Sequence, residues 1–329
     1  ILDPIVIAPN STSTEAMHNA IELAQFAESL DFARYWIVEH HGVHYEATPA
    51  PEILAGAILN KTSKIRVGIG GFLLNNYSPY KIAELIKSLN ALYPDRLDFG
   101  IGHSQSGEIP DFALQANRNN PSHYEHSAAL EELLHWLDND FPKDHPFSTI
   151  PIMRDQPRYP NIWAMAVSEP TAIHAAKLGI NLACSAFHKP ELAVNSLNMY
   201  REHYQPARGT GSYAQPKDFL AIRLIIADTQ EEAERLAMPM RYQFHQRRIN
   251  KIMPFTTPTV EDAIEFAGGI WPAESSDWPM YVVGDKERVY RTLSNMIEQT
   301  NVSEIVVQDV LPTLDLRKKM YTQLATLFD

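Results

Sequence analysis

The chain alternates short apolar runs, rich in β-branched residues, with longer segments of helical periodicity. Several of the short runs are almost wholly apolar, which is typical of parallel strands that helices cover on both faces. Repeated strand–helix units of this kind indicate a closed eight-stranded β/α barrel, the TIM barrel, rather than an open sheet. The eight strands are predicted at Asp3–Pro9, Arg34–Glu39, Ile65–Phe72, Arg96–Gly102, Asn161–Ser168, Asn181–Phe187, Phe219–Ala227 and Glu304–Asp309.

The segments between the strands carry helix signals. Thr12 and Glu15 have the spacing of a capping box. Pro79–Leu92 begins with a proline suited to a first helical turn, and Glu169–Leu178 ends at Gly179, a suitable C-cap. An open nucleotide-binding sheet would need a glycine-rich loop after its first strand, but that strand runs into Pro9-Asn10-Ser11-Thr12. The barrel is therefore the favoured fold.

The 329 residues suit one barrel domain spanning 1–329. Two stretches, about 102–122 and 244–279, exceed ordinary connection length, and the second is an insertion late in the barrel. Loops that follow the strands of a barrel lie at its catalytic face. Both stretches are candidates for functional loops; the alternative is that they are surface excursions.

Composition excludes several functions. The net charge of −12, from 28 basic and 40 acidic residues, argues against non-specific nucleic-acid binding. The sequence has neither a run of eighteen apolar residues nor a basic segment followed by an apolar one, so no membrane span and no signal peptide are expected. Cys184 is the single cysteine, which rules out an internal disulfide and favours the reducing cytoplasm.

Glu39-His40-His41 ends the second predicted strand, with His44 three residues further on. Barrel enzymes place catalytic side chains at this end of the strands. A histidine near neutral pH can act as an acid, a base or a metal ligand. The alternative is that both histidines are structural hydrogen-bonding groups beneath a loop. A metal site needs three or more converging ligands, and because the sequence has no second cluster with ligand spacing, none is expected.

Polar or small residues also end three later strands. Gly68-Ile69-Gly70-Gly71 is compatible with a flat cofactor lying on the backbone or with tight barrel packing. Gly102-His103-Ser104 follows the fourth strand. Ser168-Glu169-Pro170-Thr171 leads from the fifth strand into a helix, and hydroxyls with free N–H groups there suit an anion. Alternatively, Ser168 only caps the helix.

The order and spacing of six segments add a further indication. They are Arg34–His41, Ile65–Leu74, Asn76–Pro79, Pro94–Gly102, Val283–Asp285 with the following helix, and Ser303–Val307. Together they resemble the bacterial luciferase-like monooxygenase family over nearly the whole chain. The most similar pattern is that of luciferase-like oxidoreductases of mostly unknown substrate.

This resemblance implies a flavin-dependent oxidoreductase, a monooxygenase that uses reduced FMN and dioxygen on a small organic substrate. A separate flavin reductase would supply the reduced FMN. The implied catalytic residues are Glu39, His40 and His41, with His40 as a base or hydrogen-bonding group beside the flavin. The implied cofactor-binding residues are Gly70, Gly71, Gly102, His103, Ser168 and Thr171. Among these, Gly70-Gly71 would be a non-prolyl cis peptide, and Ser168 and Thr171 would hold the phosphate.

The resemblance also implies a homodimer formed by the helices at 51–61 and 79–92. The expected contacts are Ile53, Leu54, Ile58, Leu85 and Leu89, unless these side chains only cover the barrel.

Three residues depart from the pattern of the family. Relatives often have arginine at the position of His103, a hydroxyl residue at Val167, and no carboxylate at Glu169. These changes weaken the expected phosphate site. Two alternatives therefore accompany the monooxygenase: a deazaflavin-dependent hydride-transfer enzyme, and a non-catalytic relative that binds flavin or has lost its cofactor.

Overall fold

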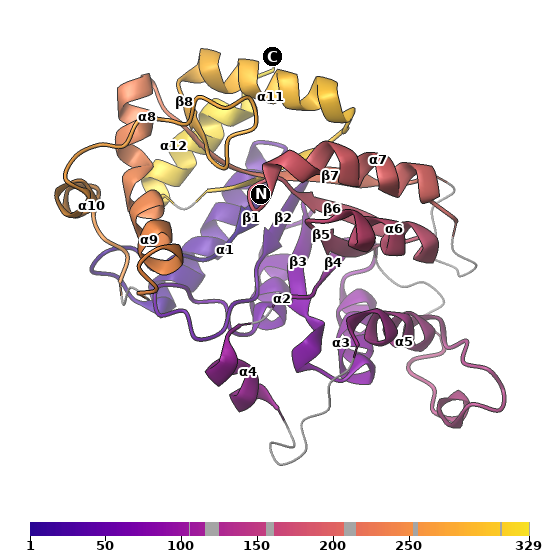
Figure 1. Cartoon of the computed structure of the whole chain (residues 1–329). Helices are drawn as coiled ribbons and strands as arrows, with labels where there is room; N and C mark the ends of the chain where they lie inside the picture. Colours follow the sequence, from indigo (N-terminus) through magenta and orange to yellow (C-terminus); the bar gives the residue numbers. More distant parts are fainter. Residues whose placement is uncertain are drawn as a thin grey trace.

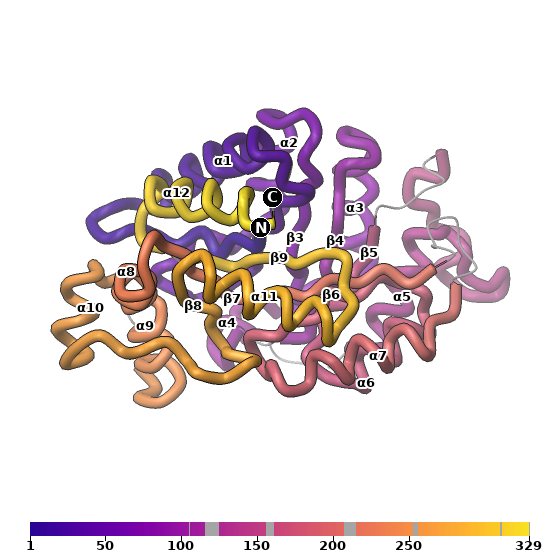
Figure 2. Tube along the Cα trace, turned by 90° about the horizontal axis from the view of Figure 1, so that it is seen from above, coloured from indigo at the N-terminus to yellow at the C-terminus, as the bar shows by residue number. Residues whose placement is uncertain are grey.

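The computed structural model describes residues 1–104, 106–115, 125–155, 161–206, 215–252, 256–309 and 311–328. Within them, parallel strands β1 to β7 pair in sequence order around a barrel, and β9 pairs with β7 and also contacts β1. The predicted β/α barrel is therefore confirmed (Figures 1 and 2). The strands are β1 Leu2–Asp3, β2 Arg34–Ile37, β3 Arg66–Leu73, β4 Leu97–Gly102, β5 Asn161–Ala166, β6 Asn181–Ser185, β7 Asp218–Ile226, β8 Val282–Gly284 and β9 Ile305–Gln308.

Helices surround the sheet, and Figure 2 shows them on both sides of the strands. Three of the predicted helix signals are confirmed: the capping box of Thr12 with Glu15, the start at Pro79, and the left-handed C-cap at Gly179. The helices are α1 Ser13–Ser29, α2 Pro51–Lys61, α3 Pro79–Leu92, α4 Glu108–Leu114, α5 His126–Asp138, α6 Glu169–Leu178, α7 Ala193–His203, α8 Gln230–Leu236, α9 Met238–Arg248, α10 Val260–Ala267, α11 Lys286–Thr300 and α12 Leu314–Ala325. Short 3₁₀ turns lie at Leu74–Asn76, Pro146–Thr149 and Pro190–Leu192.

Two strand predictions need correction. The first strand ends at Asp3 instead of Pro9, because Pro4 has no N–H to donate and Ile5 adopts a left-handed conformation (φ 51°). The predicted eighth strand is β9, and β8 was not among the predicted strands. This three-residue strand pairs with Leu224–Ile226, beyond the part of β7 that pairs with β9. Three residues are too few for a recognisable alternation.

The two long stretches contain helices. The stretch at 102–122 includes α4, at the bottom of Figure 1, while Gln105 and 116–122 lie outside the described residues. The stretch at 244–279 includes the end of α9 and then α10, which Thr259 and Asp262 cap reciprocally. Helix α8 and most of α9 separate this second stretch from β7. Its residues Phe244 and Arg248 lie near Arg223 of β7, as described below.

Aromatic side chains fill the barrel interior. Trp36 of β2 meets Trp163 and Phe219 edge-on, with ring centroids 5.7 Å and 5.1 Å away. A Cβ atom added at Gly68 or Gly70 would lie 2.3 Å or 2.6 Å from the Trp36 ring. The glycines of β3 thus leave room for this indole, so packing explains their position without a ligand.

Charge pairs close the N-terminal end of the barrel. The buried Asp98 accepts hydrogen bonds from Arg34 Nη1 at 2.6 Å and Arg66 Nη2 at 2.8 Å, and Arg34 also pairs with Glu304. Burial alone would raise the pKa of Asp98, but the two guanidinium groups hold it below its ordinary value. This end is occupied by its own ion pairs, so the C-terminal end is the one that favours a ligand.

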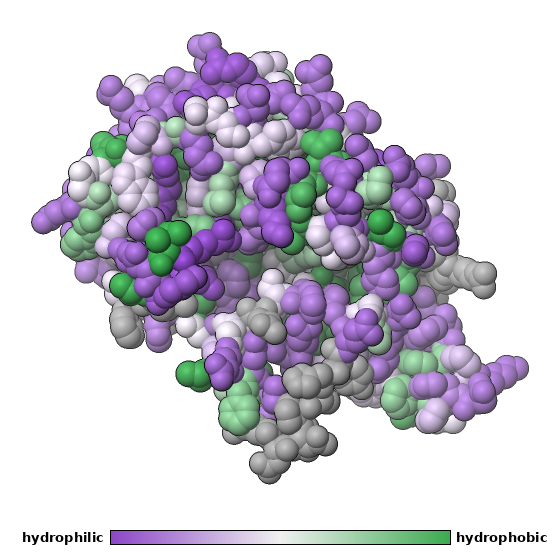
Figure 3. Space-filling view, in the orientation of Figure 1, coloured by the Kyte–Doolittle hydropathy of each residue, from purple (hydrophilic) through white to green (hydrophobic). Residues whose placement is uncertain are grey.

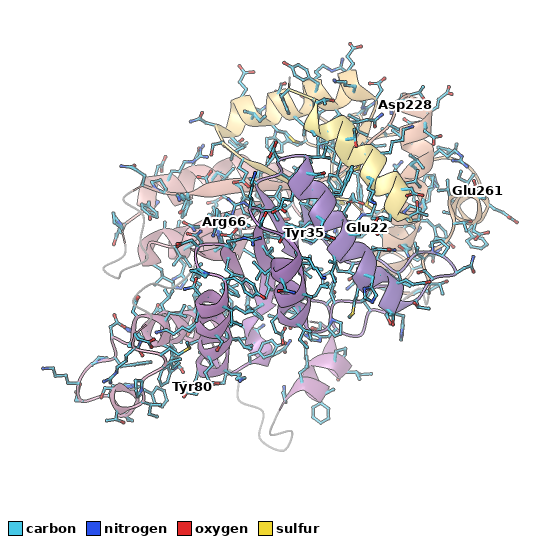
Figure 4. The ribbon with its side chains drawn as sticks, turned by 180° about the vertical axis from the view of Figure 1, so that it is seen from behind. Glu22, Tyr35, Arg66, Tyr80, Asp228 and Glu261 are labelled. Carbon is cyan, nitrogen blue, oxygen red and sulfur yellow. The ribbon has the colours of Figure 1, made fainter. Side chains whose placement is uncertain are left out.

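A buried network joins the first and last strands of the barrel. Arg317 of α12 donates to Asp309, after β9, with Nε at 2.8 Å, and to Asp3 of β1, with Nη2 at 2.9 Å. The hydroxyls of Tyr35 and Tyr321 donate to Asp3 and Asp309. Figure 4 shows α1 and α12 side by side from behind, with Tyr35 labelled close to both helices. The network ties β1, β2, β9 and α12 together where the barrel closes.

The side chains expected at a dimer interface divide into two groups. Leu54 and Ile58 are buried in the core of this chain, so they cover the barrel, as the alternative stated. Ile53 is 72 % exposed, whereas Leu85 and Leu89 pack partly against the core. The homodimer therefore stays a prediction that rests on Ile53 and its neighbours.

Figure 3 shows a mainly hydrophilic face with small, separate hydrophobic groups. Within the described residues, no helix is both long and apolar enough to span a membrane.

Candidate active site

Glu39 lies directly beyond β2 with its carboxylate fully buried. Oε2 accepts the backbone N–H of Leu73 at 3.1 Å, and Oε1 accepts the Tyr77 hydroxyl at 2.7 Å. Burial and the adjacent Glu39 carboxylate raise the pKa of Tyr77, so its hydroxyl remains a donor. Because all these contacts are internal, the arrangement favours a positioning role for Glu39. Its predicted catalytic role stays a prediction.

The two histidines of the motif have different surroundings. His41 is 10 % exposed, and its Nε2 lies 2.5 Å from Glu39 Oε1. The His40 side chain is 37 % exposed, and its Nδ1 bonds to the mostly buried carboxylate of Glu46. His40 is therefore the member of the motif that a ligand at the mouth can reach, and Glu46 orients its ring.

The Gly70–Gly71 peptide bond is cis, as the resemblance implied. A Cβ atom at Gly71 would lie 2.5 Å from the Gly100 carbonyl oxygen and 2.6 Å from Met165 Sδ. Close approach of neighbouring strands therefore excludes a side chain there. At Gly102 the nearest atoms to an added Cβ would be 3.6 Å away, so packing does not demand glycine. Cofactor contact at Gly70, Gly71 and Gly102 stays a prediction.

The hydroxyls of Ser168 and Thr171 lie 3.2 Å apart at the start of α6. Ser168 occupies the N-cap position, but its side chain makes no capping hydrogen bond. The alternative interpretation, that Ser168 only caps the helix, is therefore not supported. Both hydroxyls point to the same place, beside the N-terminus of a helix, where a phosphate is favoured.

Three histidines gather around this helix start. His103, exposed after β4, has its ring centroid 4.5 Å from that of His126, the first residue of α5. His174 lies one turn after Thr171 along α6. Burial, with the charges of His103 and His174, lowers the pKa of His126 to about 4. Among the residues that the structure describes, two buried ring nitrogens, His126 Nδ1 and His174 Nε2, have no hydrogen-bond partner. Unpartnered buried nitrogens are costly, and an anion here would satisfy them.

Sequence reasoning identified His103, Ser168 and Thr171 but missed His126 and His174. His126 is more than twenty residues beyond the end of β4, so nothing in the sequence placed it beside that strand. His174 had a usable signal, because Ser168, Thr171 and His174 are spaced three apart and share one stripe of a helix. Groups of three or more residues suited to a metal ion do not occur among the residues that the structure describes.

A second set of polar groups lies on β7 and after β6. Arg223 of β7 extends into the barrel, and its Nε donates to Gln308 Oε1 of β9 at 2.7 Å. His188, after β6, has Nδ1 2.9 Å from Ser185 Oγ. Burial, then Arg223, Arg248 and His40, lower the pKa of His188 to about 4. The sequence had a signal for Arg223, the one charged residue inside the apolar run Phe219–Ala227.

Comparison with known proteins identifies the family. The family model described as luciferase-like monooxygenase matches residues 1–302. The chain belongs to the luciferase-like monooxygenase family. Among named members of the family, N-acetyl-S-alkylcysteine monooxygenase of Bacillus subtilis (strain 168) is 36 % identical over 71 % of this chain and 69 % of its own length.

Two solved structures agree with the fold. Apo-MsnO8 is 32 % identical and superposes with a TM-score of 0.87, covering 100 % of this chain and 97 % of its own. The oxygenating constituent of 3,6-diketocamphane monooxygenase from Pseudomonas putida, solved in complex with FMN, has a TM-score of 0.70 at 18 % identity. It covers 99 % of this chain and 96 % of its own, and at this identity the likeness shows the fold alone.

Proposed function

We propose that this chain is a flavin-dependent monooxygenase that works in the cytoplasm on a small organic substrate. It would use dioxygen and reduced FMN, the latter delivered by a separate flavin reductase. The observation that carries the proposal is the group of polar side chains at the start of α6. There the hydroxyls of Ser168 and Thr171 bond to each other, and the buried nitrogens His126 Nδ1 and His174 Nε2 have no partner among the described residues. Membership of the luciferase-like monooxygenase family supports it.

The residues at the mouth fit FMN. The hydroxyls of Ser168 and Thr171, the N-terminus of α6 and the rings of His103, His126 and His174 would hold its phosphate. The histidines thus take the place of the arginine that relatives have at the position of His103. When bound, reduced FMN supplies the electrons that activate dioxygen for transfer of one oxygen atom to the substrate.

His40 would exchange a proton with the reacting groups. Its ring is exposed at the mouth, and Glu46 fixes its orientation from the protein side. Glu39 acts one step away. It holds His41 and the backbone of Leu73, which continues directly from the Gly70–Gly71 segment. This division gives His40 the contact with the ligand and gives Glu39 the support of the strand ends.

Isotope labelling tests the proposed reaction. The purified chain is mixed with a flavin reductase, NADH, FMN and ¹⁸O₂ and with a panel of thioethers, aldehydes and ketones. N-acetyl-S-methylcysteine belongs in the panel because of the activity of the Bacillus subtilis relative. Mass spectrometry should find a product with one ¹⁸O atom that needs both FMN and the chain. Reduced FMN oxidised at the same rate with and without the chain, and no labelled product, would contradict the proposal.

The histidines should make FMN affinity depend on pH. In the chain without ligand, the pKa of His126 is lowered to about 4. A bound phosphate would raise this pKa, so His126 would take up a proton when FMN binds. The affinity for FMN should therefore increase as the pH falls from about 8 to about 6. Below about 6, the second pKa of the phosphate, the phosphate itself loses negative charge. Titrations followed by FMN fluorescence across this range measure the effect.

Matched variants locate the dependence on pH. His126→Ala or His174→Ala should weaken FMN binding by roughly tenfold and flatten the pH dependence, as loss of a charge-assisted hydrogen bond does. His135→Ala is the control, since His135 is on the same helix as His126 but is exposed and pairs with Asp140. Equal FMN affinities for all three variants and the wild type would show that the phosphate binds elsewhere.

A further inference from the structure

Arg223 lies at the mouth in an aromatic enclosure. Its guanidinium carbon is 4.5 Å from the ring centroid of Phe187 and 4.8 Å from that of Phe244. The ring of Tyr281 is 5.4 Å away, and the Tyr281 hydroxyl accepts a hydrogen bond from Nη1 at 3.4 Å. Three elements far apart in the sequence, after β6, in α9 and before β8, therefore surround one charged group. Rings and a guanidinium attract one another but leave the positive charge uncompensated.

No carboxylate forms an ion pair with Arg223 among the residues that the structure describes. Other interior arginines are paired: Arg34 with Asp98, and Arg317 with Asp3 and Asp309. The Glu46 carboxylate acts on the pKa of Arg223 from a distance, but it is bonded to His40. Burial lowers the pKa of Arg223, which shows that its charge is poorly compensated.

The groups facing Arg223 are also basic. Arg248 lies over Phe244 from the other side, 4.1 Å from the ring centroid. Arg248 and Arg223 both depress the pKa of His188, and His40 adds to this effect. Like charges that lie close together and form no ion pair with a carboxylate repel one another. A bound anion would relieve that repulsion. The same region offers the rings of Phe187 and Phe244 to an apolar group.

We propose that Arg223 binds the carboxylate of the substrate, so that this monooxygenase acts on small organic acids with an apolar or aromatic remainder. This inference rests on the proposed function and adds the substrate class to it. The carboxylate accepts from the Nη groups of Arg223, with Arg248 nearby. The apolar part lies against Phe187 and Phe244, pointing towards His40 and the flavin. Planar guanidinium groups suit carboxylates because they donate two parallel hydrogen bonds.

Direct binding of acids and their amides tests this class. The probes are 3-phenylpropionate and hexanoate, each compared with its carboxamide by isothermal titration calorimetry on the chain without FMN. Each acid should bind at least about tenfold more tightly than its amide, because only the acid satisfies the charge of Arg223. Equal affinity of acid and amide, or no binding of either acid, would overturn the inference. This comparison needs no variant, so it stands even if a substituted chain fails to fold.

Variants then assign the effect to Arg223. Arg223→Gln should lower the affinity for the acids by about 10- to 100-fold and leave the affinity for the amides unchanged. Arg223→Lys should lie between this variant and the wild type, since lysine keeps the charge but not the bidentate geometry. Arg235→Gln is the control, an arginine on α8 that pairs with the exposed Glu261. Wild-type affinity of Arg223→Gln for the acids would contradict the assignment.

A final arm separates this inference from the proposed function. The acids are titrated into the chain saturated with FMN, and they should bind as before, because the proposed contacts of the phosphate, at the start of α6, and of the acid, at Arg223, share no residue. Displacement of the acids by FMN would mean that Arg223 binds the cofactor phosphate, which overturns the inference. A chain that binds FMN but no acid refutes only the substrate class. A chain that binds acids but no FMN refutes the proposed function.

Discussion

Replacing His40 by alanine is expected to lower kcat by about 10²- to 10⁴-fold, the usual contribution of a positioned acid or base. His40 is the exposed member of the motif, and its outward orientation comes from the bond between Nδ1 and Glu46. Its side chain is partly exposed and belongs to neither hydrophobic core cluster, so the fold should persist. Steady-state oxidation of the best substrate from the panel, together with a far-UV circular dichroism spectrum, measures both effects.

Two further variants sharpen this test. Glu46→Gln keeps a polar group beside the ring but removes the carboxylate, so it should reduce kcat by a smaller factor, about tenfold, and leave KM nearly unchanged. His203→Ala is the matched control, because His203 ends α7 as an exposed residue and bonds to the Met199 carbonyl of its own helix. A His40→Ala enzyme that turns over like the wild type would remove His40 from the mechanism.

The second large effect concerns stability. Asp309→Ala is expected to cost about 3–5 kcal/mol in the free energy of unfolding, as removal of one partner of a buried ion pair does. Asp309 accepts two hydrogen bonds from Arg317 Nε, at 2.8 Å and 3.1 Å, and one from Nη2 at 2.9 Å. Burial opposes the charge of Arg317, but Asp3 and Asp309 hold its pKa well above the ordinary value, so the guanidinium stays charged. Alanine at 309 would leave this charge half compensated where the barrel closes.

Urea denaturation followed by tryptophan fluorescence measures this loss. Asp277→Ala serves as the control, because Asp277 is exposed and its change should stay within about 0.5 kcal/mol. Tyr321→Phe removes one hydrogen bond to Asp309 and should cost about 1 kcal/mol. If Asp309→Ala cost no more than Tyr321→Phe, the network would not be what holds the first and last strands together.

The barrel could be predicted because most of its strands have a recognisable local sequence pattern. β3 and β4 are apolar runs with residues of high strand propensity, and the predicted bounds agree with the structure within about two residues. β1 could not, since its short length follows from the turn at Pro4 and Ile5, which packing decides. β8 has three residues and exists only because the far end of β7 is free to pair. Long-range pairing of this kind leaves no local pattern.

The site was only partly predictable for the same reason. Glu39, His40 and His41 are adjacent in the sequence, yet their side chains have different surroundings. The buried Glu39 contacts Leu73 and Tyr77, which lie far along the chain. The histidine group combines the end of β4 with the starts of α5 and α6, and no spacing connects His103, His126 and His174. The departures at His103 and Val167 suggested a weakened phosphate site. The structure places His126 and His174 near the start of α6, each with a buried nitrogen that has no partner among the described residues, and we propose that they compensate.

The most direct test of the central claim is a comparison of FMN with riboflavin, which lacks the phosphate. Both are titrated into the purified chain in oxidised form and, without oxygen, in reduced form. Flavin fluorescence should be quenched saturably by the chain with FMN, and riboflavin should bind at least about tenfold more weakly, because the cradle of Ser168, Thr171 and the histidines recognises the phosphate. Equal affinity for the two flavins, or binding of a deazaflavin cofactor but of neither form of FMN, would contradict the account.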